Sequence, residues 1–91
     1  MLFVVRSVDK KGHLPVRLEN RPAHVEYLKG FGDRLFAAGA LLDENEEMCG
    51  SVVIVDLADK GEAETFAAGD PYAQAGLFEQ QTIDRWNKVL P

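Results

Sequence analysis

The residues Ser51–Val55 constrain the fold of this chain more than any other segment. They form an uninterrupted run without a charged side chain and rich in β-branched residues, which predicts a strand covered on both faces. A chain of 91 residues forms one domain with a modest core, so we expect a single domain over residues 1–91. The helices of so small a domain cover one face of such a strand. A second copy of the chain is then needed to cover the other face.

Turn-forming and helix-capping residues divide the chain into strands and helices. Asn20 and Pro22 are typical of a helix start, Gly39 of a helix stop, and Asp43–Glu46 of a hairpin turn. Asp59 is a suitable cap for a second helix. The expected elements are a strand over 2–8, a helix from Asn20-Arg21-Pro22 to Ala38, hairpin strands over 41–48 and 50–57, a helix over 60–68, a helical turn from Asp70-Pro71 to Gly76, and a strand over 77–90.

This order of elements, β-α-β-β-α-β, predicts an α+β fold of the ferredoxin-like type. Right-handed crossovers place both helices on one face of a four-stranded antiparallel sheet. The opposite face carries residues from 2–8 and 52–55 and is left bare, which would be a large exposed apolar patch on a monomer. We therefore expect a homodimer formed through that face, with the two sheets closing into a barrel-like sandwich.

Charge and composition exclude several classes of partner. The net charge of −5 argues against a nucleic-acid partner, and no apolar run approaches the length needed to cross a membrane. A single cysteine, Cys49, fits a cytoplasmic protein and is expected to be a packing residue. Residues 1–38 carry seven Lys/Arg against four Asp/Glu, a net +3. This basic half includes Arg6, Arg17 and Arg21, which either attract a small anionic ligand or are solvated surface residues.

The candidate chemical centre is His24 with Asp70. A stripe at the i, i+4, i+7, i+11 spacing of one helix face comprises His24, Leu28, Phe31 and Leu35. His24 is thereby predicted to face the sheet near the start of the helix, where the helix dipole favours the neutral imidazole. The second helix ends at the edge of the sheet where the first helix begins, so Asp70 should lie beside His24. A carboxylate that orients an imidazole makes a general acid–base pair.

Two structural interpretations stand beside this one. Asp70 precedes Pro71 and is a good helix N-cap, which by itself would explain the residue. A single histidine on an apolar stripe is also typical of a hydrogen-bonded core residue. The two histidines have no ligand partners at metal-site spacing, and the chain has no phosphate-binding glycine loop or dinucleotide fingerprint. We therefore expect no metal and no cofactor.

Several segments together resemble the YciI-like (YCII-related) family, and the likeness spans essentially the whole chain. They are Arg21–Leu28, Ala38–Asp43, Met48–Val55, Asp70–Glu79 and Trp86–Leu90. The resemblance implies a ferredoxin-like, dimeric α+β barrel with His24 and Asp70 as its active-site pair. One relative in this family resembles a dehydrochlorinase acting on a chlorinated hydroquinone, and the wider superfamily includes lactone isomerases and cofactor-free monooxygenases.

The chain departs from the family pattern at two places. The hairpin turn lacks the glycine that the family often has, so Asn45 is expected in the left-handed conformation. Gly30 and Gly32 stand where better helix formers are usual, which predicts a looser helix at the wall of the site.

The sequence supports one leading function and one alternative. The leading hypothesis is a cofactor-independent enzyme that uses His24 and Asp70 for proton transfer, elimination or isomerisation on an aromatic or enolisable small molecule. Ser51, Tyr72 and Arg17 are the candidate substrate contacts. The start of the third strand, with Ser51, and the turn after Asp70, with Tyr72, reach the same edge of the sheet, and Arg17 belongs to the basic half of the chain. The alternative is a dimeric module that binds a metabolite without turning it over.

Overall fold

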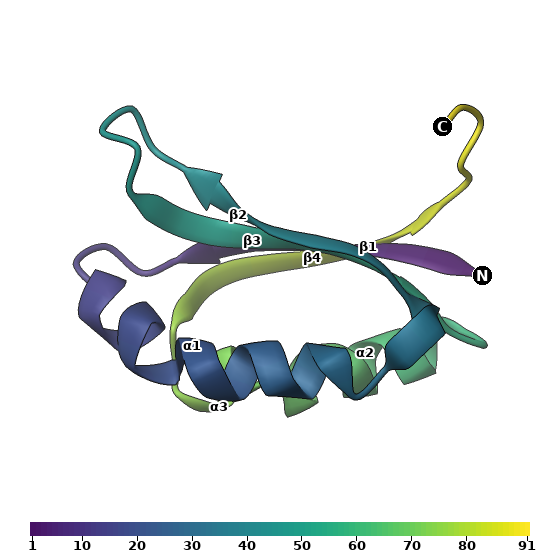
Figure 1. Cartoon of the computed structure of the whole chain (residues 1–91), viewed down its shortest axis with the longest axis horizontal. Helices are drawn as coiled ribbons and strands as arrows, with labels where there is room; N and C mark the ends of the chain where they lie inside the picture. Colours follow the sequence, from purple (N-terminus) through teal and green to yellow (C-terminus); the bar gives the residue numbers. More distant parts are fainter.

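A four-stranded antiparallel sheet organises the computed structural model, which describes residues 1–91 (Figure 1). The strands are β1 Leu2–Asp9, β2 Leu35–Leu42, β3 Met48–Asp56 and β4 Phe78–Trp86, and they lie in the order β2-β3-β1-β4. The apolar run Ser51–Val55 belongs to β3, which pairs with β1 on one side and β2 on the other. The predicted ferredoxin-like α+β fold is confirmed.

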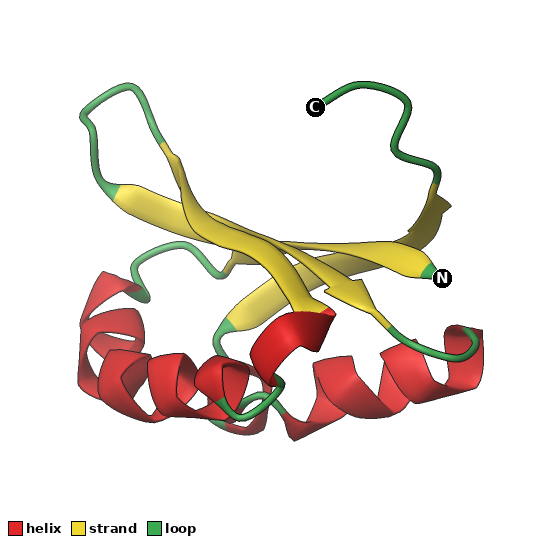
Figure 2. Cartoon of the chain, turned by 45° about the vertical axis from the view of Figure 1, so that its right-hand side comes forward, coloured by secondary structure: helices red, strands yellow, loops and turns green.

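Helices cover one face of the sheet (Figure 2). They are α1 Leu14–Lys29, α2 Lys60–Gly69 and the short α3 Pro71–Gln74, and a 3-10 turn, η1 Gly32–Arg34, follows α1. The core between these layers consists of Phe3, Val5, Leu28, Val53, Val55, Leu57, Ala63, Phe66 and Ala67. None of the helices has the length and apolar character needed to span a membrane.

The first helix begins earlier than predicted. It starts at Leu14, and Pro15 takes the place in the first turn that suits proline. Pro22 therefore lies inside α1, where it removes one backbone donor. Asn20 lies inside α1 and is therefore not its N-cap. Its side-chain amide donates to the carbonyl oxygen of Val16 at 2.9 Å.

The first helix also ends earlier than predicted. Gly30 is its C-cap, and Gly32 has a φ of 57°, so these glycines end α1 at Lys29. Neither glycine lies within the helix that the sequence predicted them to loosen at the wall of the site. The apolar stripe predicted through Phe31 and Leu35 is likewise cut short, because both residues lie beyond the helix.

The residues predicted as the last turn of the first helix belong to β2. This strand pairs with β3 from Leu35 opposite Val55 to Leu42 opposite Met48, so Gly39 lies within a strand and is not a helix stop. The β3 edge offers a full row of backbone donors and acceptors, and pairing with them outweighs the helix preference of a few alanines.

The hairpin turn between β2 and β3 is held by an aspartate. The Asp43 carboxylate accepts hydrogen bonds from the backbone N–H groups of Asn45 at 2.8 Å and Glu47 at 3.1 Å. Glu46, with a φ of 61°, takes the left-handed conformation, so the assignment of that conformation to Asn45 is wrong. The Asx-type turn supplies the compensating hydrogen bonds.

The sheet face opposite the helices is uncovered. Val4 and Ile54 alternate with buried core residues along their strands and are half-buried on this face. Phe36 and Trp86 are 48% and 38% exposed, with ring centroids 6.2 Å apart. β4 ends at Trp86 and not at Leu90, and the following residues rise from this side of the sheet, as does the β2–β3 turn (Figure 1).

Candidate functional site

Asp70 joins α2 to α3 and holds His24. Its two carboxylate oxygens lie 2.8 and 2.9 Å from Nδ1 of His24, and Oδ1 also accepts the backbone N–H of Tyr72 at 2.9 Å. Both side chains are buried. One carboxylate therefore caps α3 and orients the imidazole at the same time, so the helix-cap interpretation and the acid–base interpretation of Asp70 are compatible.

The position of His24 within its helix differs from the prediction. Because α1 begins at Leu14, His24 lies near the middle of the helix, ten residues further on (24 − 14 = 10). His24 is therefore too far from the helix N-terminus for the expected dipole effect, which fades beyond the first turn. Asp70 sets the tautomer instead: an ionised carboxylate only accepts, so Nδ1 donates to it and leaves Nε2 free.

Tyr72 fixes the plane of the imidazole. Its ring stacks on His24 with centroids 3.9 Å apart and an interplanar angle of 16°. The side chain is fully buried at 1% exposure. Burial raises the pKa of the Tyr72 hydroxyl, against the opposing effect of the positive charges of Arg17 and Arg21. Tyr72 thus forms a neutral, rigid wall behind His24.

Arg17 crosses from α1 to the sheet, where two of its three guanidinium nitrogens are bonded to protein groups. Its Nε and Nη2 donate to the Asp9 carboxylate at 2.7 and 3.0 Å, and Nη2 also donates to Ser51 Oγ at 2.8 Å. Its guanidinium carbon lies 4.5 Å from the centre of the Tyr72 ring. Burial disfavours the charge of Arg17, but Asp9 and Tyr72 together outweigh burial and raise the pKa of the guanidinium above its usual value.

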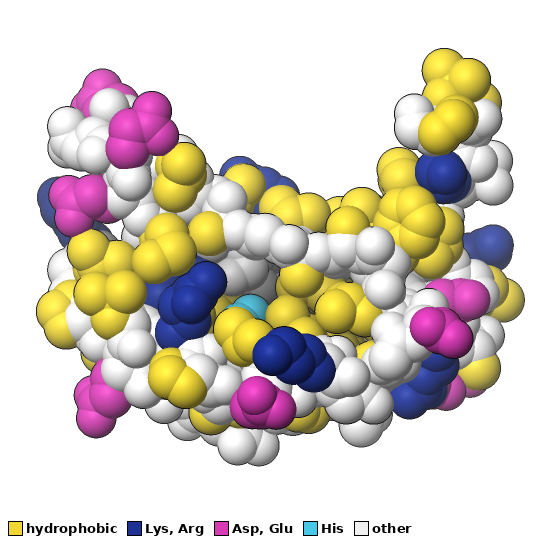
Figure 3. Space-filling model, viewed as in Figure 1, with side chains coloured by type: hydrophobic (Ala, Val, Ile, Leu, Met, Phe, Trp, Pro, Cys, Tyr) yellow, Lys and Arg dark blue, Asp and Glu magenta, His cyan; other side chains and the backbone are white.

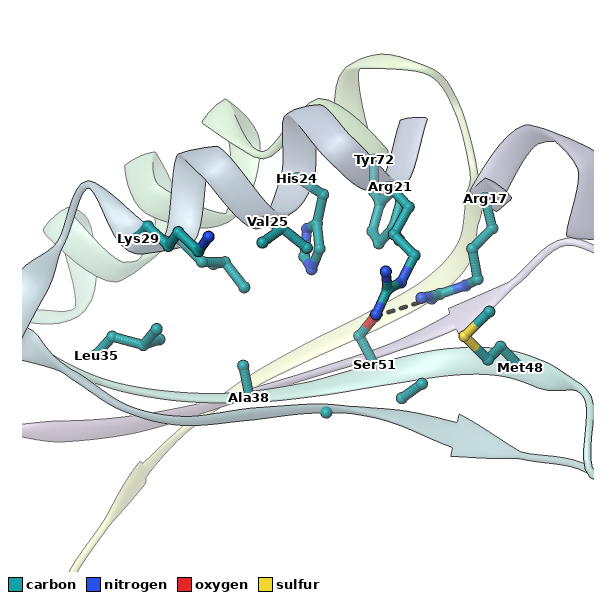
Figure 4. Close-up of a pocket in the computed structure, with 13 residues that line it drawn as sticks. Arg17, Arg21, His24, Val25, Lys29, Leu35, Ala38, Met48, Ser51 and Tyr72 are labelled. Atoms are coloured by element: carbon teal, nitrogen blue, oxygen red, sulfur yellow. Dashed lines mark hydrogen bonds between the residues drawn. The ribbon is translucent and has the colours of Figure 1, made fainter. Parts of the chain in front are cut away.

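These groups surround a cavity between α1 and the sheet (Figure 4). Its volume is about 270 Å³, at the lower end of ligand-binding pockets, which suits a small ligand. Figure 3 shows histidine atoms at the bottom of this hollow, with lysine or arginine side chains at its rim. The lining residues are Arg17, Arg21, His24, Val25, Leu28, Lys29, Leu35, Ala38, Gly39, Ala40, Met48, Ser51 and Tyr72.

The structure brings all five candidate residues together, although two of them are less free than expected. His24, Ser51, Tyr72 and Arg17 line the cavity, and Asp70 lies behind His24. Arg17 and Ser51 are hydrogen-bonded to each other, so Arg17 stabilises the wall of the site in the absence of a ligand.

Asp9 was missed in the sequence. It lies at the end of β1, just beyond the strand predicted over 2–8, and its side chain is a buried ion-pair partner of Arg17. An arginine eight residues after an aspartate carries no periodic signal, and only the turn from β1 into α1 brings the two side chains together. The structure contains no cluster of three or more His, Cys, Asp or Glu side chains that could hold a metal ion.

Tyr27 stabilises the corner between α2 and α3, the residues around Gly69 and Asp70. Its hydroxyl donates to the Phe66 carbonyl oxygen at 2.9 Å. A β-carbon on Gly69 would lie 2.6 Å from that hydroxyl, so the corner requires glycine. Burial and the negative charge of Asp70 both raise the pKa of Tyr27.

Tyr27→Phe is expected to lower the free energy of unfolding by about 1 kcal/mol at neutral pH, because one hydrogen bond is lost. In the unfolded chain the tyrosine loses its proton near pH 10, whereas in the folded chain its raised pKa keeps the proton bound to a higher pH. The stability that Tyr27 contributes is therefore present below about pH 10 and is lost as the pH rises through the raised pKa of the folded state. Urea unfolding from about pH 8 to about pH 11 should therefore show the wild type approaching the variant. A difference that stays constant over this range would contradict the role of Tyr27.

Fold and site together define a class of protein: a small ferredoxin-like α+β domain with a buried His–Asp pair at the edge of a cavity between the first helix and the sheet. The chain belongs to the YCII-related domain family, whose model matches residues 1–87. The resemblance seen in the sequence is thereby confirmed.

Relatives of known sequence and structure agree with this assignment. The protein YciI of Escherichia coli O6:H1 is 35% identical over 98 residues, covering 99% of this chain and 100% of that protein. The structure of 5-chloro-2-hydroxyhydroquinone dehydrochlorinase (TftG) from Burkholderia phenoliruptrix, in complex with 2,5-dihydroxybenzoquinone, superposes with a TM-score of 0.90 at 31% identity, covering 98% of this chain and 96% of that one. An antibiotic biosynthesis monooxygenase, at 16% identity and a TM-score of 0.60 over 99% of this chain and 100% of its own, shares the fold alone.

Proposed function

We propose that this protein is a cofactor-independent enzyme that transfers a proton through His24 in an elimination or isomerisation of a small aromatic or enolisable molecule. The observation that carries this proposal is the imidazole: Asp70 occupies Nδ1 with both oxygens, and the ring borders a cavity of about 270 Å³. The similarity to a dehydrochlorinase supports the elimination chemistry.

In the proposed reaction His24 acts as the general base. Nε2 takes a proton from an acidic O–H or C–H bond of the substrate, and Asp70 stabilises the imidazolium that results. In an elimination, the released electron pair forms a new double bond while the leaving group departs with its bonding electrons as an anion. In an isomerisation, the same imidazolium returns the proton to another atom of the substrate.

The proposal is tested by measuring chloride release from 5-chloro-2-hydroxyhydroquinone and isomerisation of a panel of lactones. His24→Gln keeps a polar side chain of similar reach and removes the base, so kcat is expected to fall about 10²- to 10⁴-fold. Circular dichroism checks that the variant is folded. Turnover that survives His24→Gln contradicts the role of His24, and saturable binding without turnover in the wild type would favour a metabolite-binding module.

We infer further that two copies of the chain associate through the uncovered sheet face. Phe36 and Trp86 on this face are large and exposed, and Val4 and Ile54 beside them are only half-buried. An apolar patch of this kind on a small domain is typical of an interface.

Trp86→Asp is expected to raise the dissociation constant of the dimer at least about tenfold, because it places a charge in an apolar interface. Light scattering over a range of protein concentrations measures this change. Trp86→Phe is the matched control and should remain dimeric. A wild type that is monomeric at every concentration would rule out this interface.

A further inference from the structure

Arg21 is the charged residue of the cavity wall that has no ion-pair partner in the chain. The charged lining residues are Arg17, Arg21 and Lys29, and no aspartate or glutamate lines the cavity. Arg17 is paired with Asp9, and the Lys29 amine lies 3.9 Å from the Glu26 carboxylate. None of the ion pairs or side-chain hydrogen bonds of the structure includes Arg21.

The helix directs Arg21 to the same place as the proposed base. Arg17, Arg21 and His24 lie on one face of α1, because they are spaced by four and three residues. Figure 4 shows the Arg21 side chain pointing from α1 into the cavity, toward Ser51 on β3 and the end of Arg17. The guanidinium groups of Arg17 and Arg21 thus lie on the same side of His24, and Asp9 balances the charge of Arg17.

Arg21 is an exposed residue, so its charge is accessible to a ligand that enters the cavity. Like charges one helical turn apart repel, and they destabilise the helix slightly. Asp70 forms no ion pair with Arg21, and its oxygens are bonded to His24 and the Tyr72 backbone. A guanidinium prefers a planar anionic group such as a carboxylate or a delocalised oxyanion. Seven of the thirteen lining residues are hydrophobic, which suits a flat apolar body attached to that anion.

We propose that Arg21 binds the negatively charged oxygen of a small planar organic anion, a carboxylate, phenolate or enolate, and holds the ligand beside His24. The inference rests on the proposed function, for which it names the substrate class. Arg21 would also stabilise the negative charge that develops on the substrate oxygen when His24 takes a proton.

The test uses 4-nitrophenol, whose ionised form absorbs at a different wavelength from its neutral form, and nitrobenzene as the neutral counterpart. Bound beside Arg21, the phenol is expected to ionise at least about one pH unit lower than in water. The wild type should also bind 4-nitrophenolate more tightly than nitrobenzene. Arg21→Gln is expected to weaken binding of the phenolate about tenfold or more and to leave nitrobenzene binding unchanged.

Three further variants separate the contributions. Arg85→Gln removes the same charge from β4, outside the cavity, and should bind as the wild type does. Arg21→Lys keeps the charge without the planar fork and should recover part of the affinity. His24→Gln should keep the preference for the anion, because Arg21 is intact.

The outcomes distinguish this inference from the proposed function. A wild type with no preference for the phenolate over nitrobenzene, or an Arg21→Gln variant that keeps the preference, overturns the role of Arg21. Full turnover by His24→Gln overturns the acid–base proposal and leaves the measured anion preference standing.

Discussion

Asp70→Ala is expected to lower kcat about 10²- to 10⁴-fold and the free energy of unfolding by about 2–4 kcal/mol. The stability loss arises because two buried donors, Nδ1 of His24 and the backbone N–H of Tyr72, lose their acceptor. The activity loss arises because the imidazole is no longer held in one tautomer. Chemical denaturation and initial rates measure the two effects on the same preparation.

Asp70→Asn separates the helix cap from the catalytic role. Asparagine caps a helix as well as aspartate does, so the bond to the Tyr72 backbone should persist and the stability loss should be clearly smaller than in Asp70→Ala. The negative charge beside His24 is lost in both variants, so kcat should fall in both. An Asp70→Asn variant with wild-type kcat would show that the negative charge of Asp70 plays no part in catalysis.

Arg17→Met is expected to lower the free energy of unfolding by about 3–5 kcal/mol, because it leaves the Asp9 carboxylate buried without its partner. The side chains of Arg17 and Asp9 are only 3% and 5% exposed, so water does not replace the lost hydrogen bonds. The Ser51 hydroxyl loses its donor as well. Urea denaturation gives the loss directly.

A double-mutant cycle identifies the cause of this loss. Asp9→Asn removes the charge that Arg17→Met would strand, so the double variant should be less destabilised than the sum of the two single variants. The coupling free energy should exceed about 1 kcal/mol for a pair this well buried. Strictly additive losses would mean that Arg17 stabilises the protein by packing, through its contact with Tyr72.

Much of the fold follows from patterns among residues that are close together in the sequence. The β-branched runs of β1 and β3, the cap at Asp59 and the Asp70-Pro71 pair all depend on local backbone preferences. Their order leaves few topologies that place helices on one face of an antiparallel sheet. His24 and Asp70 were paired by this topology, although they are 46 residues apart.

The boundaries of α1 were predicted incorrectly because the local signals there compete. Pro15 and Pro22 both have a possible place in a first helical turn, and Gly30 and Gly39 both suit a helix end. The free edge of β3 decides between them, since it pairs with residues from Leu35 onward. That edge exists only once the sheet has formed.

The sequence by itself determined the order of the elements, the family and the two residues at the centre of the candidate site, because these depend on periodicity, caps and motifs along the chain. The tertiary structure alone decided that Asp9 holds Arg17, that Tyr72 stacks on His24 and that Arg21 is left without an ion-pair partner. These are side-chain contacts between distant segments, whose direction and burial no local pattern specifies.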